Sequence, residues 1–108
     1  MIRVLIADDH AALRAGLRMV LSQSDDIEVV GEAADGQVAL TNAYALRPDV
    51  ILMDLKMPHL DGISATRELA AADMNVLVLT TYDHDDYGFG AIQAGAAGFL
   101  LKPLRLQT

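Results

Sequence analysis

The sequence has no cysteine, few basic residues and no long apolar run, and each absence excludes a class of protein. Without cysteine, the chain cannot form disulfides or a cysteine-ligated zinc site, and nothing points to an oxidising compartment. No apolar run approaches the length of a membrane span, and the N-terminus lacks the apolar region and cleavage site of a signal peptide. We therefore expect a cytoplasmic protein that makes no contact with a membrane.

The charge balance is acidic, with 15 Asp and Glu residues against 8 Lys and Arg, which gives a net charge of −7. Because contacts to phosphates require Lys and Arg, this balance argues against nucleic-acid binding by this segment itself. It is compatible with a cation site built from carboxylates. The length of 108 residues and the apolar content of 53% predict one globular domain.

Short apolar runs alternate along the chain with segments of helical period. The runs are Val4–Ala7, Val29–Val30, Val50–Met53, Val76–Leu79 and Phe99–Leu101. Continuous apolar runs are typical of strands that are buried on both faces of a parallel sheet. The helical segments include Leu13, Leu17, Val20 and Leu21, a stretch opened by Asp35-Gly36, and one opened by Asp61-Gly62. This alternation predicts a doubly wound α/β domain with right-handed crossovers.

The end of the chain fits this pattern less well. A fourth helix over residues 85–94 would contain Gly88 and Gly90, each costing about 1 kcal/mol relative to Ala, so we expect it to be short or mobile. Only seven residues follow Leu101, whereas the sheet face shared with the first helix calls for a fifth helix. We expect residues 1–108 to be one domain, truncated before or within that fifth helix.

Each predicted strand ends near a polar residue. Glu32 follows the second strand, near a sheet edge, and the other four strands end in five polar residues, Asp8, Asp9, Asp54, Thr80 and Lys102. Each has an ordinary explanation, since Asp9 could cap a helix, Asp54 could begin a turn and a lysine is usually solvated. However, ligands bind in open parallel sheets at the carboxyl ends of the strands, which meet at one edge. The five residues therefore predict a common site.

The chemistry of such a cluster is restricted by its charge. Three carboxylates that lie close together repel one another, and a divalent cation such as Mg²⁺ relieves the repulsion. A carboxylate can also act as a nucleophile and form an aspartyl phosphate. The ammonium and the hydroxyl would then neutralise and bind the phosphoryl oxygens. The cluster indicates phosphoryl transfer to an aspartate.

Three segments, IRVLIADDH, MDLKMPHLDG and GAAGFLLK, resemble the receiver domain of bacterial two-component response regulators. The resemblance covers essentially the whole chain and is closest to the NarL/FixJ (LuxR-type) subfamily. It implies a flavodoxin-like (CheY-like) sheet of five parallel strands in the order 2-1-3-4-5. It also implies a helix-turn-helix output domain beyond this chain, which would contact DNA and regulate transcription.

The resemblance assigns a role to each residue of the predicted site. Asp54 matches the phospho-acceptor. Asp9 and Asp54 match direct ligands of Mg²⁺ (or Mn²⁺). The backbone carbonyl of Lys56 matches a further ligand, and Asp8 matches a residue that binds the ion through water. These assignments predict a metal-dependent acceptor site.

The remaining roles concern the response to phosphorylation. Thr80 and Lys102 match the residues that bind the phosphoryl group, and Thr80 and Phe99 match the switch pair. The resemblance implies a sensor histidine kinase as phosphoryl donor and a homodimer on activation. It implies that the chain is not an enzyme. The domain would catalyse only its own phosphotransfer and slow autodephosphorylation.

Two other functions remain open from the residues. One is a receiver-like interaction module that works without phosphorylation. The other is an aspartate-nucleophile phosphatase, but such enzymes require a second Asp two residues after the nucleophile, where this chain has Lys56. The histidines His10, His59 and His84 lack the spacing of a zinc site, so we expect exposed or helix-capping positions for them.

Overall fold

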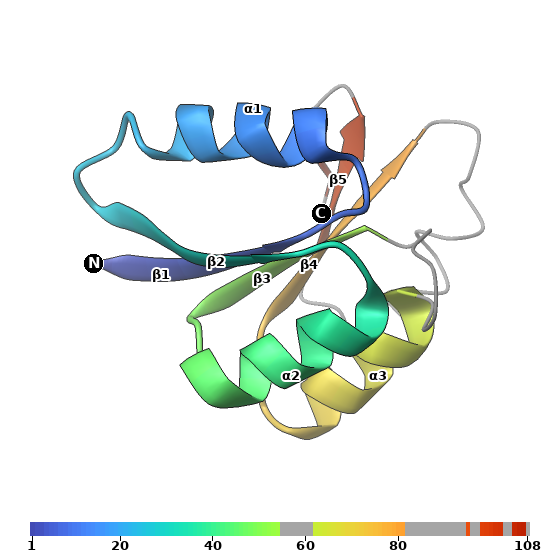
Figure 1. Cartoon of the computed structure of the whole chain (residues 1–108). Coiled ribbons are helices and arrows are strands. Elements are labelled where there is room, and N and C mark those ends of the chain that lie inside the picture. The colour runs from blue at the N-terminus through green and yellow to red at the C-terminus, as the bar shows by residue number, and fades with distance from the viewer. Residues whose placement is uncertain (55–61, 82–94, 96–97, 103–104, 108) are drawn as a thin grey trace.

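The computed structural model describes residues 1–54, 62–81, 95, 98–102 and 105–107 (Figure 1). The elements are β1 (Ile2–Ala7), α1 (Ala11–Leu21), β2 (Ile27–Ala33), α2 (Gly36–Leu46), β3 (Val50–Asp54), α3 (Gly62–Ala71), β4 (Val76–Thr81), β5 (Gly98–Lys102) and β6 (Arg105–Gln107). The predicted fourth helix over residues 85–94 lies outside the described residues. In the part of the chain that is described, no helix has the length and apolar character to cross a membrane.

The strands form one sheet in the order β2-β1-β3-β4-β5-β6. The first five are parallel, which confirms the predicted order 2-1-3-4-5. The sixth is antiparallel to β5 and was not predicted, because the segment after Lys102 was expected to lead into a fifth helix. Pairing of Leu101 with Arg105 and of Phe99 with Gln107 satisfies backbone groups that β5 would otherwise present at the sheet edge.

The helices cover both faces of the sheet. Figure 1 shows α1 on one face and α2 with α3 on the other. Successive side chains of a strand point to opposite faces, so Leu5 belongs to the core under α2 and α3, and Val4 and Ile6 belong to the core under α1. Both groups are buried. This arrangement confirms the prediction of strands buried on both faces.

The predicted apolar face of α1 is only partly correct. Leu17 is buried, and Leu13 and Leu21 pack against the same core at four-residue spacing. Val20 has 57% of its surface exposed, although its spacing also fitted the helical period. The stripe at positions i and i+4 suffices to bring α1 onto the sheet, and Val20 lies beside that stripe.

Gly95 occupies a backbone conformation that other residues adopt with strain. Its φ is 105°, and a Cβ built there would lie 2.8 Å from the Cβ of Ala70. We expect Gly95→Ala to lower the free energy of unfolding by about 1–3 kcal/mol. Gly16→Ala is the control, because Gly16 lies within α1 with nothing within 4 Å of the added Cβ, and it should stabilise the domain by about 0.5–1 kcal/mol. Urea denaturation measures both, and equal effects would contradict the local explanation.

Candidate functional site

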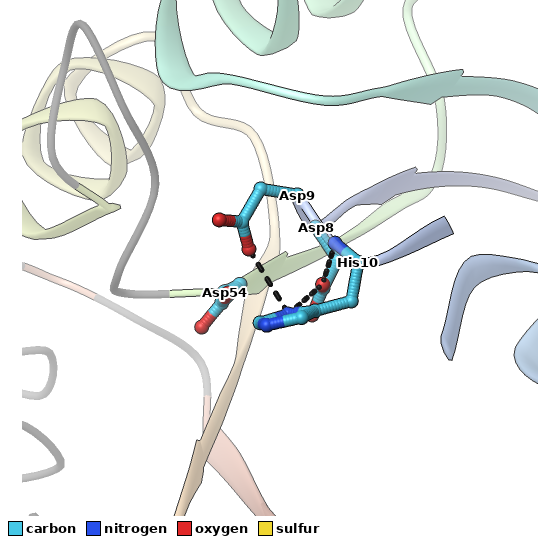
Figure 2. A group of neighbouring side chains, drawn as sticks. All are labelled: Asp8, Asp9, His10 and Asp54. Carbon is cyan, nitrogen blue, oxygen red and sulfur yellow. Dashed lines mark hydrogen bonds and ion pairs between the residues drawn. The ribbon is translucent and has the colours of Figure 1, made fainter. Parts of the chain in front are cut away.

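The carboxyl ends of β1 and β3 bring three carboxylates together. The strands are neighbours with Ala7 opposite Met53, so Asp8 and Asp54 follow at adjacent positions of the sheet edge. Asp8 is fully buried and Asp54 is 5% exposed, whereas Asp9 is exposed. Figure 2 shows the three carboxylates grouped with His10, and one ligand atom from each of the four residues lies within 4.8 Å of the others. The structure thus unites the three predicted acidic residues.

The backbone and the carboxylate of Asp8 are both held. Its N–H donates to the carbonyl oxygen of Ala33 at 3.0 Å, which continues the pairing of β1 with β2 beyond the last strand residue. Its Oδ1 accepts a hydrogen bond from the backbone N–H of His10 at 2.7 Å. An aspartate that binds the N–H two residues later closes a tight turn. This turn sets the direction in which the chain leaves β1 and enters α1.

His10 lies closer to the site than its sequence context predicted. It is the residue that caps α1, and its side chain is 67% exposed, as expected for an exposed or capping histidine. The cap makes no side-chain hydrogen bond, and the ring instead places Nδ1 3.0 Å from Oδ1 of Asp8 and 3.0 Å from Oδ1 of Asp9 (Figure 2). The alternative in which Asp9 caps the helix is therefore wrong. Adjacency to the acidic pair was the only sequence signal for this contact.

The donor set suits a divalent cation. Three carboxylates with nearby oxygens require a positive partner, and carboxylate oxygens are the ligands preferred by Mg²⁺ and Mn²⁺. Burial of Asp8 and Asp54 strengthens this requirement because water screens their charges less than at the surface. The cluster therefore fits a divalent cation such as Mg²⁺.

The other predicted site residues are described only in part. Asp54 pairs with Leu79 and Thr81 pairs with Lys102, so the main chains of Thr80 and Lys102 reach the same edge of the sheet as Asp54. Phe99 lies on β5 opposite Val78. The side chains of Thr80, Phe99 and Lys102, and all of residue 56, lie outside the described residues. Their roles stay predictions.

A neighbour of the acidic pair was not anticipated from the sequence. Arg14, on the first turns of α1, donates a hydrogen bond from Nη1 to the carbonyl oxygen of Asp8 at 2.6 Å. It also contacts Glu32 on β2. A charged residue on a helical segment usually indicates a solvated face, so the sequence alone carried no signal for this contact.

The family follows from comparison with known proteins. A model of the response regulator receiver domain matches residues 4–108. The chain belongs to that family. The receiver domain of NarL from Mycobacterium tuberculosis superimposes with a TM-score of 0.89 and 40% identity, over 96% of this chain and 86% of that structure. The response regulator domain of CheB from Thermotoga maritima gives a TM-score of 0.89 and 37% identity, over 95% of this chain and 79% of that structure. The predicted family and CheY-like fold are confirmed.

Two curated relatives are a transcriptional regulatory protein and a response regulator. The transcriptional regulatory protein LiaR of Bacillus subtilis is 48% identical over 94% of this chain and 49% of its own length. The response regulator GacA of Pseudomonas viridiflava is 43% identical over 94% of this chain and 49% of its own length. The chain therefore spans about half the length of the curated relatives it matches. It is the receiver domain of a response regulator, similar to regulators of the NarL/LuxR type.

Proposed function

We propose that Asp54 of this receiver domain accepts a phosphoryl group from a sensor histidine kinase in the presence of Mg²⁺ or Mn²⁺. The observation that carries the proposal is the nearly buried carboxylate of Asp54 at the end of β3, grouped with Asp8 and Asp9. Burial of a carboxylate costs free energy, so a purely structural role does not explain its position. Asp54 lies at the carboxyl ends of the parallel strands, where ligands bind in this type of fold.

The transfer is a substitution at phosphorus. A carboxylate oxygen of Asp54 attacks the phosphorus of the kinase phosphohistidine, and the new O–P bond forms as the N–P bond breaks. The electron pair of the broken bond stays on the imidazole nitrogen of the kinase. Asp9, Asp54 and the Lys56 carbonyl would hold the cation, with Asp8 acting through water. When bound, the cation supplies positive charge to the phosphoryl oxygens, and Lys102 and Thr80 supply further donors.

The same residues suggest how phosphorylation is transmitted. The phosphoryl group adds charge and acceptor oxygens that the Thr80 hydroxyl and the Lys102 ammonium would bind. Thr80 lies opposite Leu101 on β5, two residues from Phe99. A shift of β4 would therefore displace β5 at Phe99, the predicted switch residue. The proposal includes homodimerisation on activation and a DNA-binding output domain outside this chain, in a cytoplasmic regulator. The relative LiaR is named as a transcriptional regulatory protein, which supports this part.

Phosphorylation by a small phosphodonor tests the proposal directly. We expect intact-mass measurement to detect one added phosphoryl group after incubation with acetyl phosphate and MgCl₂, and none when EDTA replaces MgCl₂. The metal dependence follows from the need to neutralise three carboxylates before an anionic donor can approach. No mass gain under any condition would contradict the proposal and favour an interaction module that works without phosphate. Turnover of a phosphate monoester would favour the phosphatase alternative.

A further inference from the structure

Arg14 connects the acidic pair to the neighbouring strand. Its guanidinium donates from Nη1 to the Asp8 carbonyl oxygen at 2.6 Å and from Nε to Oε1 of Glu32 at 3.1 Å. The side chain is 19% exposed, so this fork is partly shielded from water. A planar guanidinium with two directed bonds fixes both partners relative to each other. Arg14 thereby ties the end of β1 to β2.

The acceptor is the carbonyl of the peptide bond that joins Asp8 to Asp9. On its other side, the N–H of Asp8 is bound to the carbonyl of Ala33 on β2. The two bonds fix both backbone groups of Asp8. The plane of the Asp8–Asp9 peptide determines the direction in which the Asp9 side chain leaves the backbone. Loss of the Arg14 bond would remove one constraint on that plane and leave the turn from Asp8 to His10 as the other.

Glu32 is itself held from several directions. Its Oε2 accepts from Nε of Arg18 at 2.8 Å, and its backbone carbonyl accepts from the side-chain amide of Asn42 on α2 at 3.1 Å. Glu32 is therefore a firm anchor for Arg14. The guanidinium of Arg18 hydrogen-bonds to Glu32 within the described part of the chain, and its side chain is 46% exposed. Arg18 thus shares the anchor and lacks the bond to Asp8.

We propose that Arg14 is a positioning residue for the divalent cation, because it orients the Asp8–Asp9 peptide and with it the two carboxylates. The inference rests on the proposed function, which places the cation at Asp9. The charge of Arg14 alone would act in the opposite direction, since a guanidinium near a cation site repels the ion. The sign of the effect on Mg²⁺ affinity therefore separates positioning from simple electrostatics.

The test compares the Mg²⁺ dissociation constant of wild type, Arg14→Met and Arg18→Met by calorimetric titration. Methionine retains an unbranched stem and removes both the charge and the donors. We expect Arg14→Met to weaken Mg²⁺ binding about tenfold, as for other residues that orient metal ligands. Arg18→Met should bind Mg²⁺ as tightly as wild type or more tightly, because it loses a cation and keeps the Asp8 bond. Arg14→Lys keeps the charge without the fork and should restore binding only in part.

A second readout needs no metal. The amide ¹H and ¹⁵N shifts of Asp9 and His10 should change in Arg14→Met and stay near wild type in Arg18→Met. Unchanged or tighter Mg²⁺ binding by Arg14→Met would overturn the inference, as would an equal loss in Arg18→Met. If Arg14→Met does not fold, wild-type affinity in Arg14→Lys would overturn it instead. A wild-type chain that binds no Mg²⁺ would contradict the proposed function, while the metal-free shifts would still show whether Arg14 orients the turn.

Discussion

Asn in place of Asp54 is expected to abolish phosphorylation and leave the domain folded. The amide has nearly the shape of the carboxylate, so the packing at the end of β3 is kept. It is not a nucleophile toward phosphorus, so no O–P bond can form. Intact-mass measurement with acetyl phosphate and MgCl₂ should detect no added phosphoryl group. Asp25→Asn is the matched control, because Asp25 is exposed and precedes β2 at the amino ends of the strands, opposite the acidic cluster, and it should label as wild type.

The same substitution should also change stability in a way that depends on the metal. Without a divalent cation, removing one of three neighbouring carboxylates relieves repulsion, and we expect a gain of about 1 kcal/mol, or roughly 5 °C in Tm. With saturating Mg²⁺ the order should reverse, because the wild type binds the ion more tightly and is stabilised by that binding. Thermal unfolding in EDTA and in MgCl₂ measures both. Labelling of Asp54→Asn at the wild-type level would place the acceptor elsewhere.

The largest effect on stability is expected from Leu69→Ala. Leu69 on α3 is fully buried in the core shared with α2 and the sheet. Truncation removes buried methyl groups and leaves a cavity, so the free energy of unfolding should fall by about 2–5 kcal/mol. Such a loss is a large fraction of the total stability of a small domain and should lower Tm by about 10 °C or more.

The control for this prediction is Val20→Ala on α1. Val20 is also an apolar helix residue, but it is 57% exposed, so its truncation should change stability by less than about 0.5 kcal/mol. Urea denaturation with equal m-values for the variants makes the comparison valid. A cost below about 1 kcal/mol for Leu69→Ala would mean that α3 contributes little to the core.

Much of the fold was predictable because buried strands and helix faces require apolar residues at regular positions in the sequence. A strand covered on both faces must be apolar at every position, as in Val50–Met53, and such runs alternated with helical segments. Asp35 was a predictable helix start, and its side chain accepts a hydrogen bond from the N–H of Val38. The site followed from the same pattern, because residues that end neighbouring parallel strands meet at one edge.

Other features depend on which surfaces meet. Val20 fitted the helical period but lies outside the contact with the sheet. The period predicts the apolar face of the helix, whereas the packing of α1 on the sheet decides how much of that face is buried. The β6 strand depends on pairing with β5, which three residues do not predict. Both required the assembled sheet.

The sequence by itself determined the parallel α/β fold and the gathering of Asp8, Asp9 and Asp54, because apolar runs mark buried parallel strands and the residues that end such strands meet at one edge of the sheet. Only the tertiary structure decided the contacts of His10 and Arg14 with that site. The hydrogen bond from Arg14 to Asp8 is accepted by a backbone carbonyl, a group that every residue type carries. Such a contact leaves no pattern in the sequence and becomes visible only when helix and strand are packed together.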